Sequence, residues 1–304
     1  MNAPSVQSLP ERRNPERVLQ RLEWRVIRRL DGLLQGDYRT LFYGEGIDFA
    51  NLREYELTDD VRQIDWNITA RMDRPFVRQY MQDREVTCWF LLDLSPSMAF
   101  GPLKHSKQEI LTDFVTTLAR ILTRNGNRVG AITYSSQIDR IIPPRSGRNQ
   151  VLRLARDLLR YDGKTAASGT DLSVLINAAL NSFKRRSLVL LISDFISAPG
   201  WEGRLALLNQ KHELIAVRLS DPRELELPDA GLILLQDSET AEQLYVDTSN
   251  LEFRRRFLEA GRRREAALRG SLARAGVDFH SISTEEDLVH ALVRMATQRK
   301  KRRI

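Results

Sequence analysis

The 304-residue chain has only one cysteine, Cys88, and four histidines, His105, His212, His280 and His290. A single cysteine cannot form a disulfide within the chain, and its place inside a β-rich apolar run predicts a buried, unreactive thiol. The histidines are too scattered to give the ligand spacing of a zinc site. These shortages exclude a disulfide-stabilised scaffold and a structural zinc centre.

Long apolar runs are missing as well. The longest have the length of a β-strand, far short of the roughly 20 residues that cross a bilayer. Residues 1–15 are polar and lack the apolar core of a secretory signal, so we expect a cytoplasmic protein. With 42% hydrophobic and 29% charged residues and no low-complexity tract, the composition predicts a globular protein with a substantial core.

The charge balance is only modestly basic, because 47 Lys and Arg residues face 40 Asp and Glu residues and give a formal net charge of +7. Five of the basic residues form the run Arg299-Lys300-Lys301-Arg302-Arg303 at the carboxyl end. This run is either a solvated helix end or a contact for acidic protein, lipid or nucleic acid. We favour the solvated helix end.

The hydrophobic pattern changes along the chain and divides it into four parts. Asn14-Pro15 is a helix start signal, and apolar residues then recur at helical spacing until Gly36. The helical period is lost afterwards, and short strand-like segments follow up to Glu85. The expected parts are a disordered start (1–13), a module with a helix and short strands (14–85), a larger domain (86–297) and a basic tail (298–304).

Strand and helix patterns alternate in the larger domain. Strands are predicted at 86–92, 128–134, 138–142, 188–192, 213–219 and 277–282, with short extended pieces at 232–235 and 243–246. Helices are predicted from about 107 to Asn125-Gly126, at 149–160, 171–183, 201–208 and 251–275, and after the capping box Ser283-Thr284-Glu285-Glu286. The second and third strands are joined tightly, as in a hairpin. Such alternation predicts an α/β, Rossmann-like domain with a mostly parallel central sheet flanked by helices.

Two of the apolar strands end on the same chemistry. The first runs into Asp93-Leu94-Ser95-Pro96-Ser97, and the fourth runs into Ser193-Asp194. Between them, Ser168-Gly169-Thr170-Asp171 opens a helix. If both strands are buried and parallel, their polar ends meet at the carboxyl edge of one sheet, where open α/β folds bind ligands.

Five oxygen-bearing side chains at this edge predict a site for a divalent cation. Hydroxyl and carboxylate oxygens suit Mg²⁺, Mn²⁺ or Ca²⁺. Each hydroxyl alone could equally cap a helix or a turn, and nearby Asp171 and Asp221 are better explained as a helix-start charge and a loop residue. The predicted ligands are Asp93, Ser95, Ser97, Thr170 and Asp194.

Neutral hydroxyls and only two carboxylates leave a cation electrophilic and short of one ligand, which an acidic group from outside can supply. The pattern D-x-S-x-S, then T, then D resembles the metal-ion-dependent adhesion site (MIDAS) of von Willebrand factor A (vWA) domains. It is met at Asp93, Ser95, Ser97, Thr170 and Asp194. The resemblance covers about residues 86–297 and implies the vWA fold.

The amino-terminal module carries a second resemblance. Its motifs are Gly44-Glu45-Gly46-Ile47-Asp48-Phe49, Leu52-Arg53-Glu54-Tyr55, Asp59-Asp60-Val61-Arg62-Gln63-Ile64-Asp65-Trp66-Asn67 and Ala70-Arg71. They resemble the signature of the domain of unknown function 58 family, bacterial vWA proteins associated with MoxR-type AAA+ ATPases. The chain departs from that pattern at Leu57-Thr58, where relatives usually have Pro-Gly, and in lacking amino-terminal membrane helices.

The charges of this module interleave, which makes bidentate ion pairs plausible with Trp66 as an apolar anchor. Such a network either holds the module on the larger domain or forms a docking surface for a partner, and we favour the former. The charged residues are Arg53, Arg62 and Arg71 with Glu54, Asp60 and Asp65.

Three functions are weighed. The favoured one is a non-enzymatic adaptor that binds an acidic group of a MoxR-type ATPase or a client protein through its metal site. The second is a Mg²⁺-dependent phosphohydrolase with Asp93 as nucleophile, which is disfavoured because such enzymes carry a second acid where this chain has Ser95. The third is nucleic-acid binding by the arginine triplets 254–256 and 262–264, which a solvated helix explains better.

Overall fold

The computed structural model describes residues 14–33, 52–56, 59, 61, 64, 66–72, 74–78, 85–101, 106–161, 169–236 and 242–302. Several expectations lie outside these residues: the disordered start at 1–13, the segment 44–49, Ser168, and the charged residues Asp60, Arg62 and Asp65.

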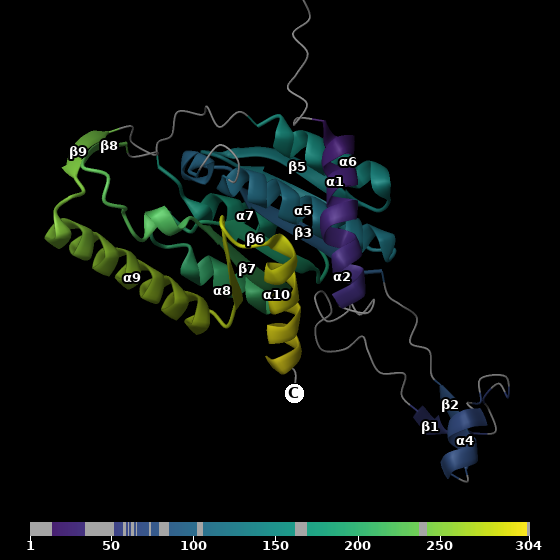
Figure 1. Cartoon of the computed structure of the whole chain (residues 1–304). Helices are drawn as coiled ribbons and strands as arrows, with labels where there is room; N and C mark the ends of the chain where they lie inside the picture. The colour runs from purple at the N-terminus through teal and green to yellow at the C-terminus, as the bar shows by residue number, and fades with distance from the viewer. Residues whose placement is uncertain are drawn as a thin grey trace, which may run out of the picture.

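A sheet forms the centre of the molecule (Figure 1). It has six strands in the order β10-β7-β6-β3-β4-β5. All neighbouring pairs are parallel except β4 and β5, which form the expected antiparallel hairpin. The strands are β3 (Thr87–Asp93), β4 (Arg128–Tyr134), β5 (Ile138–Arg145), β6 (Leu188–Ser193), β7 (Glu213–Ser220) and β10 (Asp278–Ser283). The predicted fold class is therefore confirmed.

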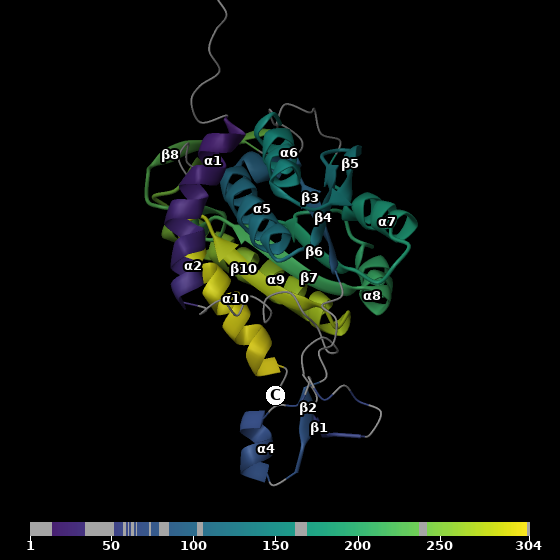
Figure 2. The same cartoon turned by 90° about the vertical axis from the view of Figure 1, so that its right-hand side faces the viewer.

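Helices cover both faces of the sheet, as Figure 2 shows. Side chains of β3 alternate between the two cores: Phe90 and Leu92 face one, and Trp89 and Leu91 face the other. The first core is closed by α5 (Lys107–Arg124), α6 (Arg148–Leu159) and α10 (Leu288–Arg302). The second is closed by α7 (Leu172–Ser182), α8 (Glu202–Lys211) and Leu272 of α9 (Leu251–Arg274). Burial on both faces explains why the central strands are continuous apolar runs.

The amino-terminal helix packs on the first core. It comprises α1 (Pro15–Leu22), a π-helical segment (Glu23–Ile27) and α2 (Arg28–Leu33), and the Asn14 side chain accepts a hydrogen bond from Glu16 N at 3.0 Å, which confirms the predicted cap. Its apolar face, including Leu19 and Leu30, belongs to the same buried cluster as α5 and α10. The helix is thus part of the wall of the larger domain rather than of the short strands that follow it.

The short elements after this helix are β1 (Leu52–Glu54), α4 (Trp66–Met72) and β2 (Phe76–Arg78), with β1 and β2 antiparallel. Glu54 pairs with Arg74 at 2.8 Å. The expectation that Trp66 is an apolar anchor is wrong, because its side chain is 64% exposed.

The last third of the chain contains an antiparallel hairpin, β8 (Leu232–Gln236) with β9 (Gln243–Asp247), before the long helix α9. The predicted capping box at Ser283-Thr284-Glu285-Glu286 is wrong. The α10 helix is capped by Asp287, whose Oδ1 accepts from Val289 N at 2.9 Å, whereas Ser283 Oγ accepts from Glu285 N at 3.3 Å in the turn before the helix. In the same turn Thr284 donates to Asp221.

Two predictions about single residues have clear outcomes. Cys88 is fully buried, which confirms the predicted burial, and this burial, with nearby Glu213, raises the pKa of its thiol. Arg299 is not part of a solvated tail: it is 6% exposed, pairs with Glu213, and lies 3.1 Å from Asp278.

Among the described residues, no helix combines the length and hydropathy needed to span a membrane.

Gly130 allows β4 to pack closely against its neighbours. A Cβ atom at this position would lie 2.8 Å from the Ile142 carbonyl oxygen and 3.0 Å from the Trp89 ring. We expect Gly130→Ala to lower the free energy of unfolding by about 1–3 kcal/mol, because backbone atoms cannot move aside cheaply. Gly203→Ala in α8 is the control, since nothing lies within 4 Å of its Cβ position. Equal denaturation midpoints for both variants would contradict this account.

Candidate functional site

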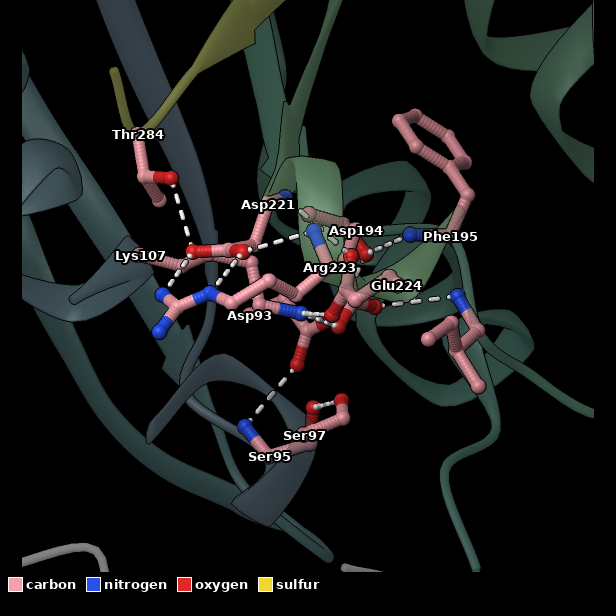
Figure 3. Close-up of polar contacts among 12 residues, drawn as sticks. Asp93, Ser95, Ser97, Lys107, Asp194, Phe195, Asp221, Arg223, Glu224 and Thr284 are labelled. Atoms are coloured by element: carbon pink, nitrogen blue, oxygen red, sulfur yellow. Dashed lines mark hydrogen bonds and ion pairs between the residues drawn. The ribbon is translucent and has the colours of Figure 1, made fainter. Parts of the chain in front are cut away.

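The strands β3 and β6 lie side by side at the centre of the sheet; β3 ends in Asp93, and Asp194 directly follows β6. Leu92 pairs with Ile192, so that Asp93 and Asp194 emerge together at the carboxyl edge (Figure 3). After β3, the strands β4 and β5 are added on one side of β3, and the next strand, β6, lies on the other side. This is the topological switch point, where open α/β sheets form their binding crevice.

Asp93 is completely buried and held by two hydrogen bonds. Its Oδ1 accepts from Ser95 N at 2.9 Å, and its Oδ2 accepts from the Ser193 hydroxyl at 2.5 Å. Burial and then the negative charge of Asp194 raise the pKa of Asp93 to about 7, although the bonds from Ser193 and Ser95 act in the opposite direction. The carboxylate is therefore in an environment that favours a cation or a proton.

Ser95 and Ser97 lie on the turn that follows β3. A short 3-10 helix, Pro96–Ala99, orients them so that their hydroxyl oxygens face each other at 3.1 Å. Both residues are almost fully buried. Two hydroxyl oxygens thus converge beside the Asp93 carboxylate, as the alternating pattern predicts.

The segment with Thr170 is held at the same edge by contacts of its backbone. The Thr170 carbonyl accepts from Ala198 N at 2.8 Å, and Asp171 N donates to the Tyr134 hydroxyl at 2.8 Å. Thr170 is 4% exposed. Asp171 caps α7 by accepting from Ser173 N, which confirms its prediction as a helix-start residue.

Asp194 is fixed by the turn that follows β6. Its Oδ1 accepts from Ile196 N at 2.9 Å, while Phe195 N donates to Ser193 Oγ at 2.8 Å. Phe195 has φ of 60°, the one positive φ among the described non-glycine residues. Left-handed backbone at a large side chain is costly, and such strain concentrates at functional sites.

Lys107 is the main residue of this site that sequence reasoning missed. Its side chain is fully buried at the start of α5, and its Nζ lies 2.7 Å from Asp194 Oδ2 and also pairs with Glu224. Burial lowers the pKa of Lys107, but Asp194 and Glu224 outweigh it and leave the pKa above its ordinary value. The one signal in the sequence is a lysine in the first turn of a helix, where the helix dipole disfavours positive charge.

Glu224 is held by the loop after β7. Asp221 and Glu224 form a capping box on the short helix η5 (Pro222–Glu224). Asp221 is buried, so the prediction of an ordinary loop residue misses its role. Burial raises its pKa, but hydrogen bonds from Arg223 and Thr284 lower it to about 2. Asp221 therefore stays charged and anchors the segment that carries Glu224.

The arrangement fits a hard divalent cation. Two buried carboxylates and two facing hydroxyls offer oxygen donors, and Lys107 neutralises one of the carboxylates. Across the described residues, no three His, Cys, Asp or Glu side chains are grouped to hold a metal ion. The predicted site has only two such side chains, Asp93 and Asp194, because its other three ligands are hydroxyls. The five ligands stay a prediction, and Asp93, Ser95, Ser97, Thr170 and Asp194 would hold the ion.

Two apolar side chains are exposed on the turns that form the site. Phe100 follows the turn of Ser97 and is 44% exposed, and Ile196 follows Asp194 and is 40% exposed. Exposed apolar side chains beside a polar centre can contribute contacts to a bound protein.

A family model described as "Protein of unknown function DUF58" matches residues 51–267, which is more than half of the chain. An uncharacterized protein of Mycobacterium tuberculosis is 31% identical over 286 residues, covering 93% of this chain and 89% of its own length. A shorter uncharacterized protein of Mycobacterium avium is 29% identical over 160 residues, which is 53% of this chain and 94% of that protein.

Solved structures also share similarity with the chain. One is the conserved hypothetical protein BatB from Bacteroides thetaiotaomicron, with 15% identity, a TM-score of 0.45, and coverage of 71% of this chain and 99% of that one. Another is an aerotolerance-related membrane protein from Bacteroides fragilis, with 15% identity, a TM-score of 0.46 and the same coverage.

The raised pKa of Asp93 predicts how stability depends on pH when metal is removed by a chelator. The folded protein holds this proton more tightly than the unfolded chain, so its stabilising effect is complete below about pH 4 and is lost as the pH rises toward 7. Each pH unit in that window lowers the free energy of unfolding by about 1.4 kcal/mol at most. Relative to Asp93→Asn, the free energy of unfolding of the wild type should fall by about 2–3 kcal/mol between pH 5 and pH 8.

The measurement is urea unfolding in EDTA at several pH values, with Asp93→Asn as the reference because it cannot ionise. Parallel stability curves for the two proteins would show that the Asp93 carboxyl titrates normally.

Proposed function

The chain belongs to the DUF58 family, and we propose that it is a non-enzymatic, cytoplasmic interaction protein that binds an acidic group of a partner through a divalent cation at its sheet edge. The observation that carries this proposal is the meeting of the Ser95 and Ser97 hydroxyls, 3.1 Å apart, beside the buried carboxylates Asp93 and Asp194. Mg²⁺ is the expected ion, with Mn²⁺ or Ca²⁺ as substitutes.

Each residue has a separate part in this proposal. Asp93, Ser95 and Ser97 supply oxygen donors from one turn, and Thr170 and Asp194 complete the site from two other segments. Bound there, the ion supplies an electrophilic centre that accepts one further oxygen ligand. Phe100 and Ile196 supply apolar contacts around that point, which add affinity and exclude water.

The same residues argue against hydrolysis. Ser95 and Ser97 follow Asp93 where a phosphohydrolase would need a second acid, and Lys107 is paired with Asp194 and Glu224.

The arginine triplet 254–256 is paired with acidic residues: Arg254 with Asp229, Arg255 with Glu259 and Arg256 with Glu252. A solvated helix with local ion pairs explains this triplet better than nucleic-acid binding.

We further propose that the partner is a MoxR-type AAA+ ATPase or a client protein of that motor. The amino-terminal motifs support this partner through their resemblance to MoxR-associated proteins. In this role the chain would help the motor to assemble or activate other proteins, with the acidic ligand coming from either partner.

Metal binding tests the site directly. Isothermal titration of the chelator-treated protein with Mg²⁺ and Mn²⁺ should show one saturable site, and Asp93→Ala and Ser97→Ala should each weaken it by about 10-fold or more. Asp113→Ala is the control, because it removes a negative charge from α5 that pairs with Arg21 away from this edge. Equal heats for the wild type and Asp93→Ala would exclude the metal site.

Partner binding tests the adaptor role. A purified MoxR-type ATPase should bind the immobilised chain in Mg²⁺ and dissociate in EDTA, in at least one nucleotide state. Phe100→Ala and Ile196→Ala should weaken binding by about 10-fold, the typical cost of an apolar contact in an interface. Leu207→Ala is the matched control, since Leu207 is 42% exposed on α8. No complex in either the ATP-bound or the ADP-bound state would count against the adaptor role.

A further inference from the structure

Lys107 is an ammonium group buried within the candidate cation site. Its side chain has no exposed surface, and the Asp194 side chain that it contacts is 1% exposed. Two of its three N–H groups have acidic partners, Asp194 Oδ2 at 2.7 Å and Glu224 Oε1. The group thus lies where a charge is expensive to bury unless its partners are fixed.

The surroundings fix all three members of this contact. Asp194 is oriented by the Ile196 N–H, and Glu224 accepts from Asp221 N at 3.3 Å through its second oxygen. The Phe100 ring lies over Lys107, with its centroid 5.9 Å from Nζ. The ammonium group therefore lies between its two acidic partners and is shielded from solvent, and Figure 3 shows it beside Asp194 and Glu224.

The charges at the edge show what this lysine does. Asp93 and Asp194 lie close together, because Leu92 pairs with Ile192 and Asp93 Oδ2 accepts from the hydroxyl of Ser193, the residue before Asp194, at 2.5 Å. Lys107 balances Asp194, so Asp93 is left as the one carboxylate in the pair that has no cation beside it in the structure described. A divalent ion bound at Asp93 then keeps an excess positive charge, which an acidic ligand can balance.

We propose that Lys107 is a built-in counter-ion of Asp194, a positioning residue that competes with the divalent cation for this carboxylate and so keeps metal affinity low and the bound metal electrophilic. This inference rests on the proposed function for its link to partner binding. Its competition with metal, however, is tested separately.

The test is isothermal titration of the full, chelator-treated chain with MgCl₂ and MnCl₂, together with thermal unfolding in EDTA and in metal. Lys107→Met keeps the length of the side chain and removes its charge. We expect this variant to bind either metal at least 10-fold more tightly than the wild type, and its melting temperature to depend more strongly on metal. A purely structural role for Lys107 predicts the opposite, namely weaker or unchanged binding.

Glu224→Gln is the matched second variant. It removes the other partner of Lys107 and leaves the ammonium facing Asp194 alone, so metal binding should weaken by about 3-fold or more. Binding that is unchanged or tighter in Glu224→Gln, or unchanged or weaker in Lys107→Met, overturns the proposal. If Lys107→Met fails to fold both with and without metal, Glu224→Gln decides on the same criterion.

The results separate this inference from the proposed function. A wild type that binds no metal, with a Lys107→Met variant that does, supports the counter-ion and refutes the metal site of the natural chain. A wild type that binds metal, with a Lys107→Met variant that binds it no better, leaves the metal site standing and refutes the counter-ion.

Discussion

Two buried carboxylates at the switch point of the sheet are the constraint on which the rest of this edge depends. Asp93 and Asp194 lie at the ends of adjacent central strands, and both side chains are shielded from water. Buried carboxylates require hydrogen bonds and opposite charge, because neither can recover its hydration from solvent. The surrounding segments supply these contacts.

The contacts come from parts of the chain that are far apart in sequence. Ser193 at the end of β6 bonds across to Asp93 on β3, and Lys107 reaches Asp194 from the start of α5. Glu224 and Asp221 come from the loop after β7, and Thr284 joins that loop to the end of β10. The hydrogen bonds and ion pairs around Asp93 and Asp194 thus link the ends of four strands, β3, β6, β7 and β10, at one edge of the sheet.

Much of this architecture could be predicted from the sequence, because the relevant signals are local. Continuous apolar runs mark β3 and β6, helical periodicity marks α5 and α7, and the chain order of these elements implies a parallel sheet. The positions of Asp93, Ser95, Ser97 and Asp194 at one edge follow from that order alone. Their convergence needs no knowledge of side-chain packing.

The contacts that the sequence could not predict depend on tertiary structure. Lys107 has the pattern of an ordinary helix start, and only the folded chain shows that Asp194 and Glu224 lie around it. Ser283 fits the start of a capping box in sequence, yet its hydroxyl accepts from Glu285 N in a turn, and Asp287 caps the helix instead. In this turn the Thr284 hydroxyl donates to the buried Asp221, a contact between distant segments that local sequence does not indicate.

The proposed function at this edge is binding rather than catalysis. A catalytic site needs a base or nucleophile that is free to exchange protons with substrate. Here Asp93 accepts hydrogen bonds from Ser95 N and from the Ser193 hydroxyl, and the neighbouring carboxylate Asp194 is paired with Lys107. Hydroxyls and a paired ammonium group orient and neutralise charge. With Phe100 and Ile196 exposed on the adjoining turns, the role we propose for this edge is to hold an acidic side chain of a partner.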